Sequence, residues 1–336
     1  MMKLNLALLF FASLWPALAA EPKEITGLTE PFSVVFDQDG TLYGVEYENG
    51  NRVFQLKNDK LEFIAGSKSP ASKNLGDVAE GDGGPALKGR FNGMHDLALH
   101  PDGRLFIADT FNRRIRVIDL KTKTLTTLGD GKLTFKEPYT VSLHPDHNKL
   151  LVADLGQLKI LEIDLTSYTM KTVAGTGKRG VPQDGKKATL SPLVGPRAAI
   201  YGADGTLFIA SREGHALRHV DAQGLLHTLV NTSGKKGDSG DGGPGPAAQL
   251  NGPKHLALDP NGDIVISDDN NHALRLYKVK EKTIHLLAGT PPKSGKTLGE
   301  TPTTTTINRP HGARYDSQGG LWIVDSFNDR LLHFAK

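Results

Sequence analysis

Residues 92–119 read NGMHDLALHPDGRLFIADTFNRRIRVID, and this stretch is the unit from which the rest of the chain is built. It begins with a short apolar run and passes through an Asp-Gly turn into a second apolar run that ends at Ala108-Asp109. A polar turn and a third, alternating run from Arg114 to Asp119 complete the unit. Short alternating runs separated by Gly and Asp turns are typical of antiparallel strands joined by hairpins. The stretch therefore predicts part of an antiparallel sheet.

Recognisable copies of this unit recur along the chain, and a repeat of this kind determines the architecture. The second apolar run is the easiest to follow. Its six copies are residues 41–46, 104–109, 149–154, 206–211, 263–268 and 320–325. Most are preceded by turn residues of the same type, as in Asp39-Gly40, Asp102-Gly103, Asp204-Gly205 and Asn261-Gly262. Six similar units in succession predict six similar sheets.

A fourth run follows in most copies, for example Leu286-Leu287-Ala288-Gly289, but the last copy ends at Lys336 without one. The segment from Glu24 to Leu28 resembles the missing run. Four-stranded units closed into a ring leave no long open sheet edge. We therefore predict an all-β fold in which residues 21–336 form one six-bladed β-propeller, with the N-terminal strand completing the last blade. A β-helix is the alternative, but its coils are shorter than these units and it leaves the closing segment unexplained.

The third runs carry a family signature. Asn271-His272-Ala273-Leu274 reproduces the Asn-His-x-Leu pattern of NHL repeats, and residues 109–115 and 325–331 are two further good copies. The chain therefore resembles the NHL-repeat propellers over essentially all of residues 21–336. Glu46 and Ser211 depart from the pattern, because each stands where the repeat has Asp. The resemblance implies the fold but says little about a reaction, since unrelated functions share one fold.

The first 20 residues have the pattern of an export signal. Lys3 precedes an apolar segment from Leu4 to Trp15, and residues 16–20 read PALAA, which is typical of a cleavage site. The chain has no cysteine and a formal net charge of +3. We expect a signal peptide at residues 1–20 and a periplasmic or extracellular monomer without a membrane span after cleavage. The near-balanced charge disfavours nucleic acid as a partner.

Two recurring features are interpreted as structural. Asp109 with Arg114, and Asp325 with Arg330, recur at equal spacing, and a residue type that returns at one place in successive repeats serves the repeat. We expect each carboxylate to bind turn amides and each Arg to pack and pair at the blade edge. The glycine-rich residues 81–86 and 240–244 lie at equivalent points between blades, so they are interpreted as turns rather than as ion-binding loops.

The candidate site lies where each inner strand begins, after an Asn-Gly-Pro type turn. The six positions are Phe32, His95, Tyr139, Arg197, Lys254 and His311. Inner strands surround the axis of a propeller, so these side chains are expected to form a ring at the mouth of a central funnel. Five of the six carry polar groups, unlike a set chosen only to fill space. We expect a wet funnel mouth in which these side chains bury little surface.

The funnel mouth also resembles two enzyme families locally. His311 in Arg-Pro-His-Gly and His95 in Gly-Met-His-Asp resemble segments that supply zinc ligands in peptidylglycine amidating lyases, and gluconolactonase-type propellers place a metal-binding Asn at a similar point. The resemblance implies a divalent ion, Zn²⁺ or Ca²⁺, on His95 and His311. The lyases take a third His from an alternate blade, where this chain has Arg197. His255 is one residue out of register, and Asp96 is expected on the opposite strand face from its neighbour.

Two functions stay open at this point. The favoured one is a binding module for a protein, peptide or glycan, because loops on a rigid frame often carry recognition. The other is a metal-assisted lyase or lactone hydrolase. In that enzyme His95 and His311 hold the ion, Arg197 or Lys254 stabilises an anion, and Tyr139 acts as acid or base. Apart from such an ion, the sequence points to no cofactor.

Overall fold

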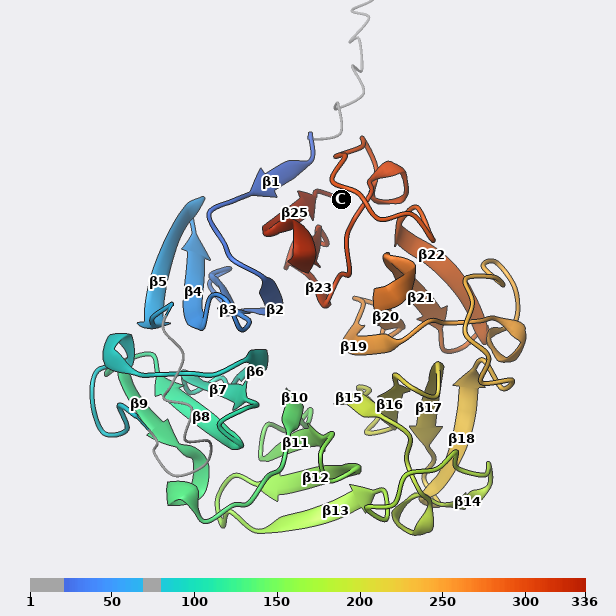
Figure 1. Cartoon of the computed structure of the whole chain (residues 1–336), viewed down its shortest axis with the longest axis horizontal. Coiled ribbons are helices and arrows are strands. Elements are labelled where there is room, and N and C mark those ends of the chain that lie inside the picture. Colours follow the sequence, from blue (N-terminus) through green and yellow to red (C-terminus); the bar gives the residue numbers. More distant parts are fainter. Residues whose placement is uncertain (1–20, 69–79) are drawn as a thin grey trace, which may run out of the picture.

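The computed structural model describes residues 21–68 and 80–336. Six antiparallel sheets stand around a central axis, and successive sheets follow one another around the ring in chain order (Figure 1). The predicted six-bladed β-propeller is confirmed. The predicted signal peptide, residues 1–20, lies outside the described residues.

Each blade has four strands that are ordered from the axis of the propeller outward. The inner strands are β2 (Pro31–Phe36), β6 (Met94–Leu99), β10 (Pro138–Leu143), β15 (Pro196–Tyr201), β19 (Pro253–Leu258) and β23 (Gly312–Tyr315). The second strands are β3 (Leu42–Glu46), β7 (Arg104–Asp109), β11 (Lys149–Asp154), β16 (Leu207–Ser211), β20 (Ile264–Asp268) and β24 (Leu321–Asp325). The blades are numbered 1 to 6 in this order.

The outer half of each blade follows the same plan. The third strands are β4 (Arg52–Lys57), β8 (Arg114–Asp119), β12 (Lys159–Asp164), β17 (Ala216–Val220), β21 (Ala273–Lys278) and β25 (Arg330–Phe334). The outer strands are β5 (Lys60–Gly66), β9 (Thr124–Thr127), β13 (Met170–Ala174), β18 (Leu225–Val230), β22 (Thr283–Gly289) and, in blade 6, β1 (Lys23–Ile25). A two-residue strand, β14 (Lys186–Lys187), pairs with β18 and gives blade 4 a fifth strand.

Short 3-10 turns complete the connections. Five of them lie between an outer strand and the next inner strand: η1 (Ala86–Lys88), η2 (Leu128–Gly131), η3 (Ala188–Leu190), η4 (Gly245–Ala247) and η6 (Pro302–Thr304). The other two, η5 (Asp269–Asn271) and η7 (Ser326–Asn328), lie between a second and a third strand. No helix among the described residues is long and apolar enough to cross a membrane.

The N-terminal strand closes the ring as predicted. Strand β1 pairs antiparallel with β25, so that Lys23 stands opposite His333 and Ile25 opposite Leu331. Figure 1 shows β1, the start of the described chain, beside β25 near the C-terminus. Beyond the strand, the Glu30 N–H donates to the Asp329 carboxylate at 2.7 Å. The first and last parts of the propeller are therefore hydrogen-bonded to each other over several residues.

A carboxylate at the end of the second strand ties each of several blades together. Asp109 accepts the backbone N–H of Asn92 at 2.8 Å and the side-chain amide of Asn112 at 2.9 Å. The same pair of bonds recurs at Asp154 with Glu137 and Gln157, Asp268 with Asn251 and Asn271, and Asp325 with Asn308 and Asn328. The structural interpretation of these carboxylates is confirmed. Each one holds the turn that precedes an inner strand.

The arginine that pairs with this carboxylate differs between blades. Asp325 pairs with Arg330 at 2.6 Å. Asp109 pairs with Arg116 at 3.4 Å. Arg116 points to the same strand face as Arg114 but is fully buried, and it also reaches Asp82 at 2.6 Å.

The glycine-rich connections are turns, as interpreted. Gly81 and Gly240 have φ angles of +89° and +102°, and an added Cβ would meet backbone of the following turn at 2.7 and 2.5 Å. Only glycine fits such positions without strain. The carboxylates within these connections, Asp82 and Asp241, pair with Arg116 and Arg275 of the same blades. Apolar side chains of adjacent blades fill the space between sheets, as Val45 of blade 1 does with Leu97 and Ile107 of blade 2.

Candidate functional site

The six predicted positions lie together at the starts of the inner strands. Five are the second residue of their strand, and His311 directly precedes β23. In blade 2 the ladder pairs Met94 with Asp109 and Asp96 with Ala108, which leaves His95 without a cross-strand partner. The same irregularity occurs at the start of β2, β10 and β15. A bulge of this kind re-aims a side chain, and here it turns the side chains towards the axis.

One side of the cluster is aromatic. The Phe32 ring stacks on His311 with ring centres 3.8 Å apart, and it meets His95 edge-on at 5.4 Å. His95 in turn contacts Tyr139 at 4.0 Å. Tyr47, from the turn after β3, stacks on the other side of Phe32 at 4.2 Å. Blades 6, 1, 2 and 3 therefore contribute one continuous set of ring contacts.

The other side of the cluster is charged. Arg197 lies over the Tyr139 ring with its guanidinium carbon 4.7 Å from the ring centre, and it pairs with Glu213 at 3.2 Å. Lys254 Nζ lies 2.9 Å from His311 Nε2 and 3.1 Å from the Asp269 carboxylate. Each cation contributed by blades 4 and 5 therefore has an acidic partner beside it.

The expectation of a wet funnel was wrong. His311 is 0% exposed, His95 is 5% exposed and Lys254 is 7% exposed, so these side chains are packed rather than solvated. The error has a physical cause, because six large side chains that converge on one axis fill the space between the inner strands. The ring that the sequence predicted is present, and it forms a closed platform instead of an open mouth.

Burial sets the protonation states of the platform. It lowers the pKa of both His95 and His311, and nearby cations and imidazoles lower it further, so both rings are neutral. It lowers the pKa of Lys254 to about 8, while Asp269 opposes that shift. It raises the pKa of the Tyr139 hydroxyl, an effect that Arg197 partly offsets. Tyr139 therefore keeps its proton at neutral pH.

The histidines do not fit the metal site that the resemblance to amidating lyases implies. His311 Nδ1 donates to the Arg309 carbonyl at 3.0 Å, and its Nε2 faces the Lys254 ammonium, which repels a second cation. His95 Nδ1 donates to the Gly93 carbonyl at 3.0 Å. Among residues 21–68 and 80–336, no group of three or more His, Asp or Glu side chains is arranged to hold a metal ion. The residues present therefore do not fit a Zn²⁺ or Ca²⁺ ion here.

Sequence reasoning missed two members of the central cluster. His255, set aside as out of register, has its ring centre 5.8 Å from those of Tyr139 and His311. Asp96 lies nearby on β6 and accepts the N–H groups of Leu97 and Val141. Burial raises the pKa of Asp96 to about 6, while Arg314 opposes the shift. The bulges explain the error, because they break the strict alternation on which the strand argument relied.

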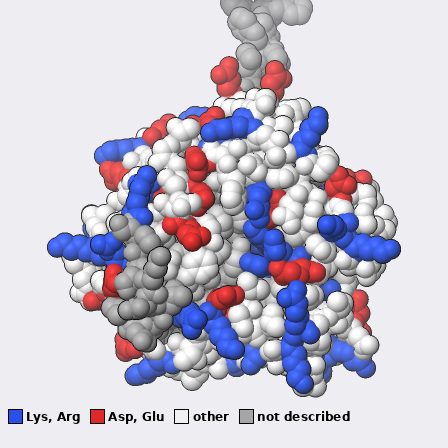
Figure 2. All heavy atoms as spheres, in the orientation of Figure 1, with Lys and Arg blue, Asp and Glu red and all other residues white. Residues whose placement is uncertain are grey.

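The surface around the platform mixes aromatic and charged groups. Phe327, 39% exposed, lies 5.9 Å from His311 between ring centres and under the Arg309 guanidinium at 4.9 Å. Arg212 pairs with Glu213 at 2.9 Å on the charged side. Figure 2 shows basic and acidic side chains interspersed over the face that it presents, so this face has no large patch of one charge sign.

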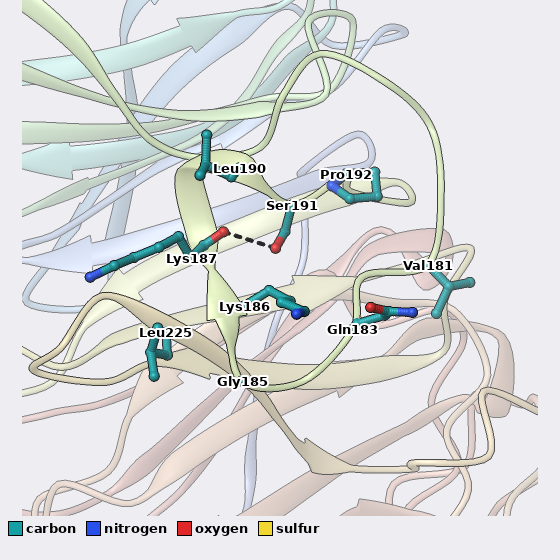
Figure 3. Close-up of a pocket in the computed structure, with 9 residues that line it drawn as sticks. All are labelled: Val181, Gln183, Gly185, Lys186, Lys187, Leu190, Ser191, Pro192 and Leu225. Atoms are coloured by element: carbon teal, nitrogen blue, oxygen red, sulfur yellow. Dashed lines mark hydrogen bonds between the residues drawn. The ribbon is translucent and has the colours of Figure 1, made fainter.

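Two hollows lie away from the axis, at the outer part of blade 4. One, of about 640 Å³, is lined by β14 and the exposed side chains of Val181 and Leu190, with Ser191 bonded to the Lys187 carbonyl (Figure 3). The other, of about 290 Å³, shares Val181 with the first and also contacts Glu213 and Arg218. In the repeat pattern, blade 4 departs from blade 2 at Ser211, which stands in place of Asp109, and at Gly214, which stands in place of Asn112.

Solved structures with the same architecture belong to several kinds of protein. An auxiliary nutrient binding protein from Bacteroides ovatus superposes with a TM-score of 0.66 and 16% identity, over 92% of this chain and 69% of that chain. Virginiamycin B lyase from Staphylococcus aureus superposes with a TM-score of 0.58 and 13% identity, over 94% and 99% of the two chains. At such low identity these likenesses show the fold alone.

Sequence relatives are more specific. Teneurin-3 of Danio rerio is 25% identical over 256 residues, which cover 70% of this chain and 9% of that protein. NHL repeat-containing protein 2 of Homo sapiens is 24% identical over 266 residues, which cover 68% of this chain and 36% of that protein. The profile of the teneurin NHL domain matches residues 133–334, more than half of the chain. The chain therefore belongs to the teneurin NHL domain family of six-bladed propellers.

Proposed function

We propose that this propeller is an exported binding module that recognises a protein or peptide on the face around the central platform. NHL propeller domains typically mediate protein interactions. The observation that carries the proposal is the closure of the funnel mouth. Because His311, His95 and Lys254 are packed, the face offers a partner an extended surface rather than a deep cavity.

The aromatic and charged groups around the platform favour a partner that carries both apolar and acidic groups, such as a peptide, over a ligand that is apolar throughout. Phe327 provides an exposed ring with the Arg309 guanidinium over it, and Arg212 of blade 4 provides a second guanidinium group, paired with Glu213. Aromatic and arginine side chains dominate the binding energy of many protein interfaces. A peptide with an apolar anchor and neighbouring acidic groups matches this arrangement.

Export is part of the proposal and rests on the N-terminal sequence. Lys3, the apolar segment from Leu4 to Trp15 and the residues PALAA at 16–20 support a cleaved signal peptide. Cleavage places the propeller in a periplasm or outside the cell. Mass spectrometry of protein recovered from either compartment should give an N-terminus near Ala20 or Glu21, and a retained Met1 would contradict export by this route.

Selection of displayed peptides tests the binding proposal. Random peptides are selected on the immobilised protein, and a labelled synthetic copy of an enriched peptide is measured by fluorescence anisotropy. Phe327→Ala should weaken binding at least tenfold, about 1.4 kcal/mol. Tyr168→Ala is the matched control, because Tyr168 is 40% exposed and lies in blade 3 beyond β12. Selection of no peptide, or equal binding by both variants, would refute recognition by this face.

A second candidate is catalysis by Lys254, a base for lyase or lactone-hydrolase chemistry. The observation that favours it is the pKa of Lys254, which burial lowers to about 8, within the range that general bases use. An assay of δ-gluconolactone hydrolysis, in which the released protons are measured, tests this candidate. The candidate requires hydrolysis that rises towards about pH 8 and that Lys254→Met abolishes.

A further inference from the structure

Blade 4 contains a buried arginine without a partner. Arg218 on β17 is 3% exposed, and its Nε and Nη1 atoms have no hydrogen-bond partner. Among the described parts of the chain, no ion pair involves its guanidinium group. Burial lowers the pKa of Arg218 to about 10, and Asp184 alone opposes this shift. Arg218 is therefore a buried cation for which Nε and Nη1 have no hydrogen-bond partner within residues 21–68 and 80–336.

The equivalent arginine forms two ion pairs in each of two other blades. Arg116 in blade 2 pairs with Asp82 at 2.6 Å and with Asp109 at 3.4 Å. Arg275 in blade 5 occupies the same strand position and has the corresponding partners, Asp241 at 3.5 Å and Asp268 at 3.4 Å. One carboxylate comes from the connection between blades and the other from the end of the second strand. In both of these blades the guanidinium therefore lies between two carboxylates.

Blade 4 lacks one of these carboxylates and the amide that accompanies it. Ser211 stands where blade 2 has Asp109, and its hydroxyl donates to the Val194 carbonyl at 2.7 Å. Gly214 stands where blade 2 has Asn112. The carboxylate of the connection, Asp184, is kept, but it accepts a hydrogen bond from Thr228 and forms no ion pair with Arg218.

The missing side chains coincide with a cavity of about 290 Å³. It is lined by Arg218 and Gly214 at buried positions and by Asp184, Ser233 and Gly234 at exposed ones, so it opens to solvent. A single water occupies roughly 30 Å³ in the liquid, so the space suits a small organic group. The cavity and the unpaired cation thus arise from the same two substitutions in the repeat.

A second unused group lines this cavity. Glu213 uses its Oε1 atom to bind Arg197 and Arg212, whereas its buried Oε2 atom has no hydrogen-bond partner in the described part of the chain. The cavity therefore offers guanidinium donors to an anion and a carboxylate acceptor to an N–H group. Buried charges left unpaired are costly in a protein interior. A ligand that supplies both partners removes that cost.

We propose that the blade 4 cavity binds an α-carboxylate with a neighbouring N–H group, as found in a free amino acid or at the C-terminus of a peptide. The ligand carboxylate takes the place that Asp109 holds beside Arg116, because planar guanidinium and carboxylate groups match in two parallel hydrogen bonds. The neighbouring nitrogen donates to Glu213 Oε2. This site adjoins the charged side of the platform, where Glu213 Oε1 binds Arg197, but it does not depend on the binding function proposed for the platform.

Ligand-observed NMR on the purified protein in chloride-free buffer tests the proposal. The probes are glycine, triglycine with a free C-terminus, triglycine amide and acetate. We expect binding of triglycine or glycine, at least tenfold weaker binding of acetate, and no binding of triglycine amide. Binding of glycine without triglycine identifies a free amino acid as the ligand class, and binding of triglycine identifies a peptide end.

Two variants separate the site from other surfaces. Arg218→Met removes the cation, and Ser211→Asp restores the carboxylate of the other blades, so each should weaken the bound probe at least tenfold. Ser211→Asp should also raise the melting temperature, which keeps the test valid if Arg218→Met does not fold. Arg179→Met is the control, because it removes an exposed cation from the same connection. Equal binding by wild type and Ser211→Asp, or equal responses to all anions including added chloride, would overturn the proposal.

Discussion

Lys254 Nζ lies 2.9 Å from His311 Nε2, and the two side chains come from adjacent blades. His311 donates from Nδ1 to the Arg309 carbonyl, so its Nε2 lone pair is free to accept from the ammonium. Burial and the Lys254 charge lower the pKa of His311, which keeps the ring neutral. Asp269 lies 3.1 Å from Nζ and completes the arrangement. Blades 5 and 6 are thus joined at the axis by a charge-assisted hydrogen bond.

The pH dependence of stability should report the burial of Lys254. Its pKa falls from 10.5 to about 8 on folding, so the unfolded chain binds more protons between these values. The contribution of Lys254 to the free energy of unfolding therefore rises with pH across this window, by up to roughly 3 kcal/mol. Lys254→Met should flatten this rise in urea unfolding measured at several pH values. Lys186→Met, at an exposed position on β14, should retain the wild-type slope, and an unchanged slope in Lys254→Met would contradict the assignment.

Replacement of His311 should destabilise the propeller. His311→Ala removes a fully buried ring that stacks on Phe32, and it leaves the Lys254 ammonium without its acceptor. We expect a loss of about 2–4 kcal/mol in the free energy of unfolding. Denaturant titration measures it, with His285→Ala as the control, because His285 is only partly buried and forms a hydrogen bond with Thr283. A loss no larger than that of the control would mean that the platform is loosely packed.

The fold was predictable because its signals are local and repeated. Each second strand agrees with its predicted run to within one residue, as at 104–109 and 149–154, since turn chemistry and alternation specify both ends. The closing strand was predictable from a missing fourth run. Strand β14 was not, because Lys186 and Lys187 carry no strand pattern and pair with β18 only through the course of their connection. Tertiary context overrides weak local preference in such segments.

The sequence predicted which residues meet at the candidate site, but it did not predict that they are buried. The repeat register brought Phe32, His95 and His311 to one place, and the contacts confirm that they meet. Whether converging side chains enclose water depends on how well their combined volume fills the space at the axis, and the alignment of the repeats does not show this. The sequence also did not show that Arg218 Nε and Nη1 have no hydrogen-bond partner among the described residues. Ser211 was visible in the sequence as a departure from the repeat. Its consequence depends on Arg218, the third residue of the next strand, β17.

Asp109 should be far more important to stability than an exposed carboxylate. It is fully buried, binds the turn at Asn92 and neutralises Arg116, so Asp109→Ala leaves a buried cation with one partner fewer. Breaking a buried ion pair costs about 3–5 kcal/mol. The exposed pair of Asp39 with Lys57 provides the control, because exposed ion pairs contribute little to stability and Asp39→Ala should cost much less. Urea unfolding of both variants decides the matter, and similar losses would refute the structural role of Asp109.

Ring closure by β1 makes a last prediction. Without residues 22–29, blade 6 loses its outer strand and exposes the edge of β25, where Leu331 now pairs with Ile25. Leu28, 6% exposed, packs in one cluster with Val324 and Leu331, and its removal uncovers that cluster. Fully burying an apolar side chain contributes roughly 1.5–3 kcal/mol. We therefore expect the truncated protein to melt well below wild type or to aggregate through the open edge.

A graded pair of variants distinguishes the strand from its neighbouring residues. Removal of residues 21–22 alone spares the ladder, which begins at Lys23, and should leave melting unchanged. Ile25→Pro keeps the chain length but removes a backbone N–H within the strand, so it should reproduce much of the effect of the full deletion. Calorimetry gives the melting temperatures, and light scattering detects association. If the full deletion melts like wild type and stays monomeric, β1 does not hold the ring closed, and the packing between blades 6 and 1 must do so unaided.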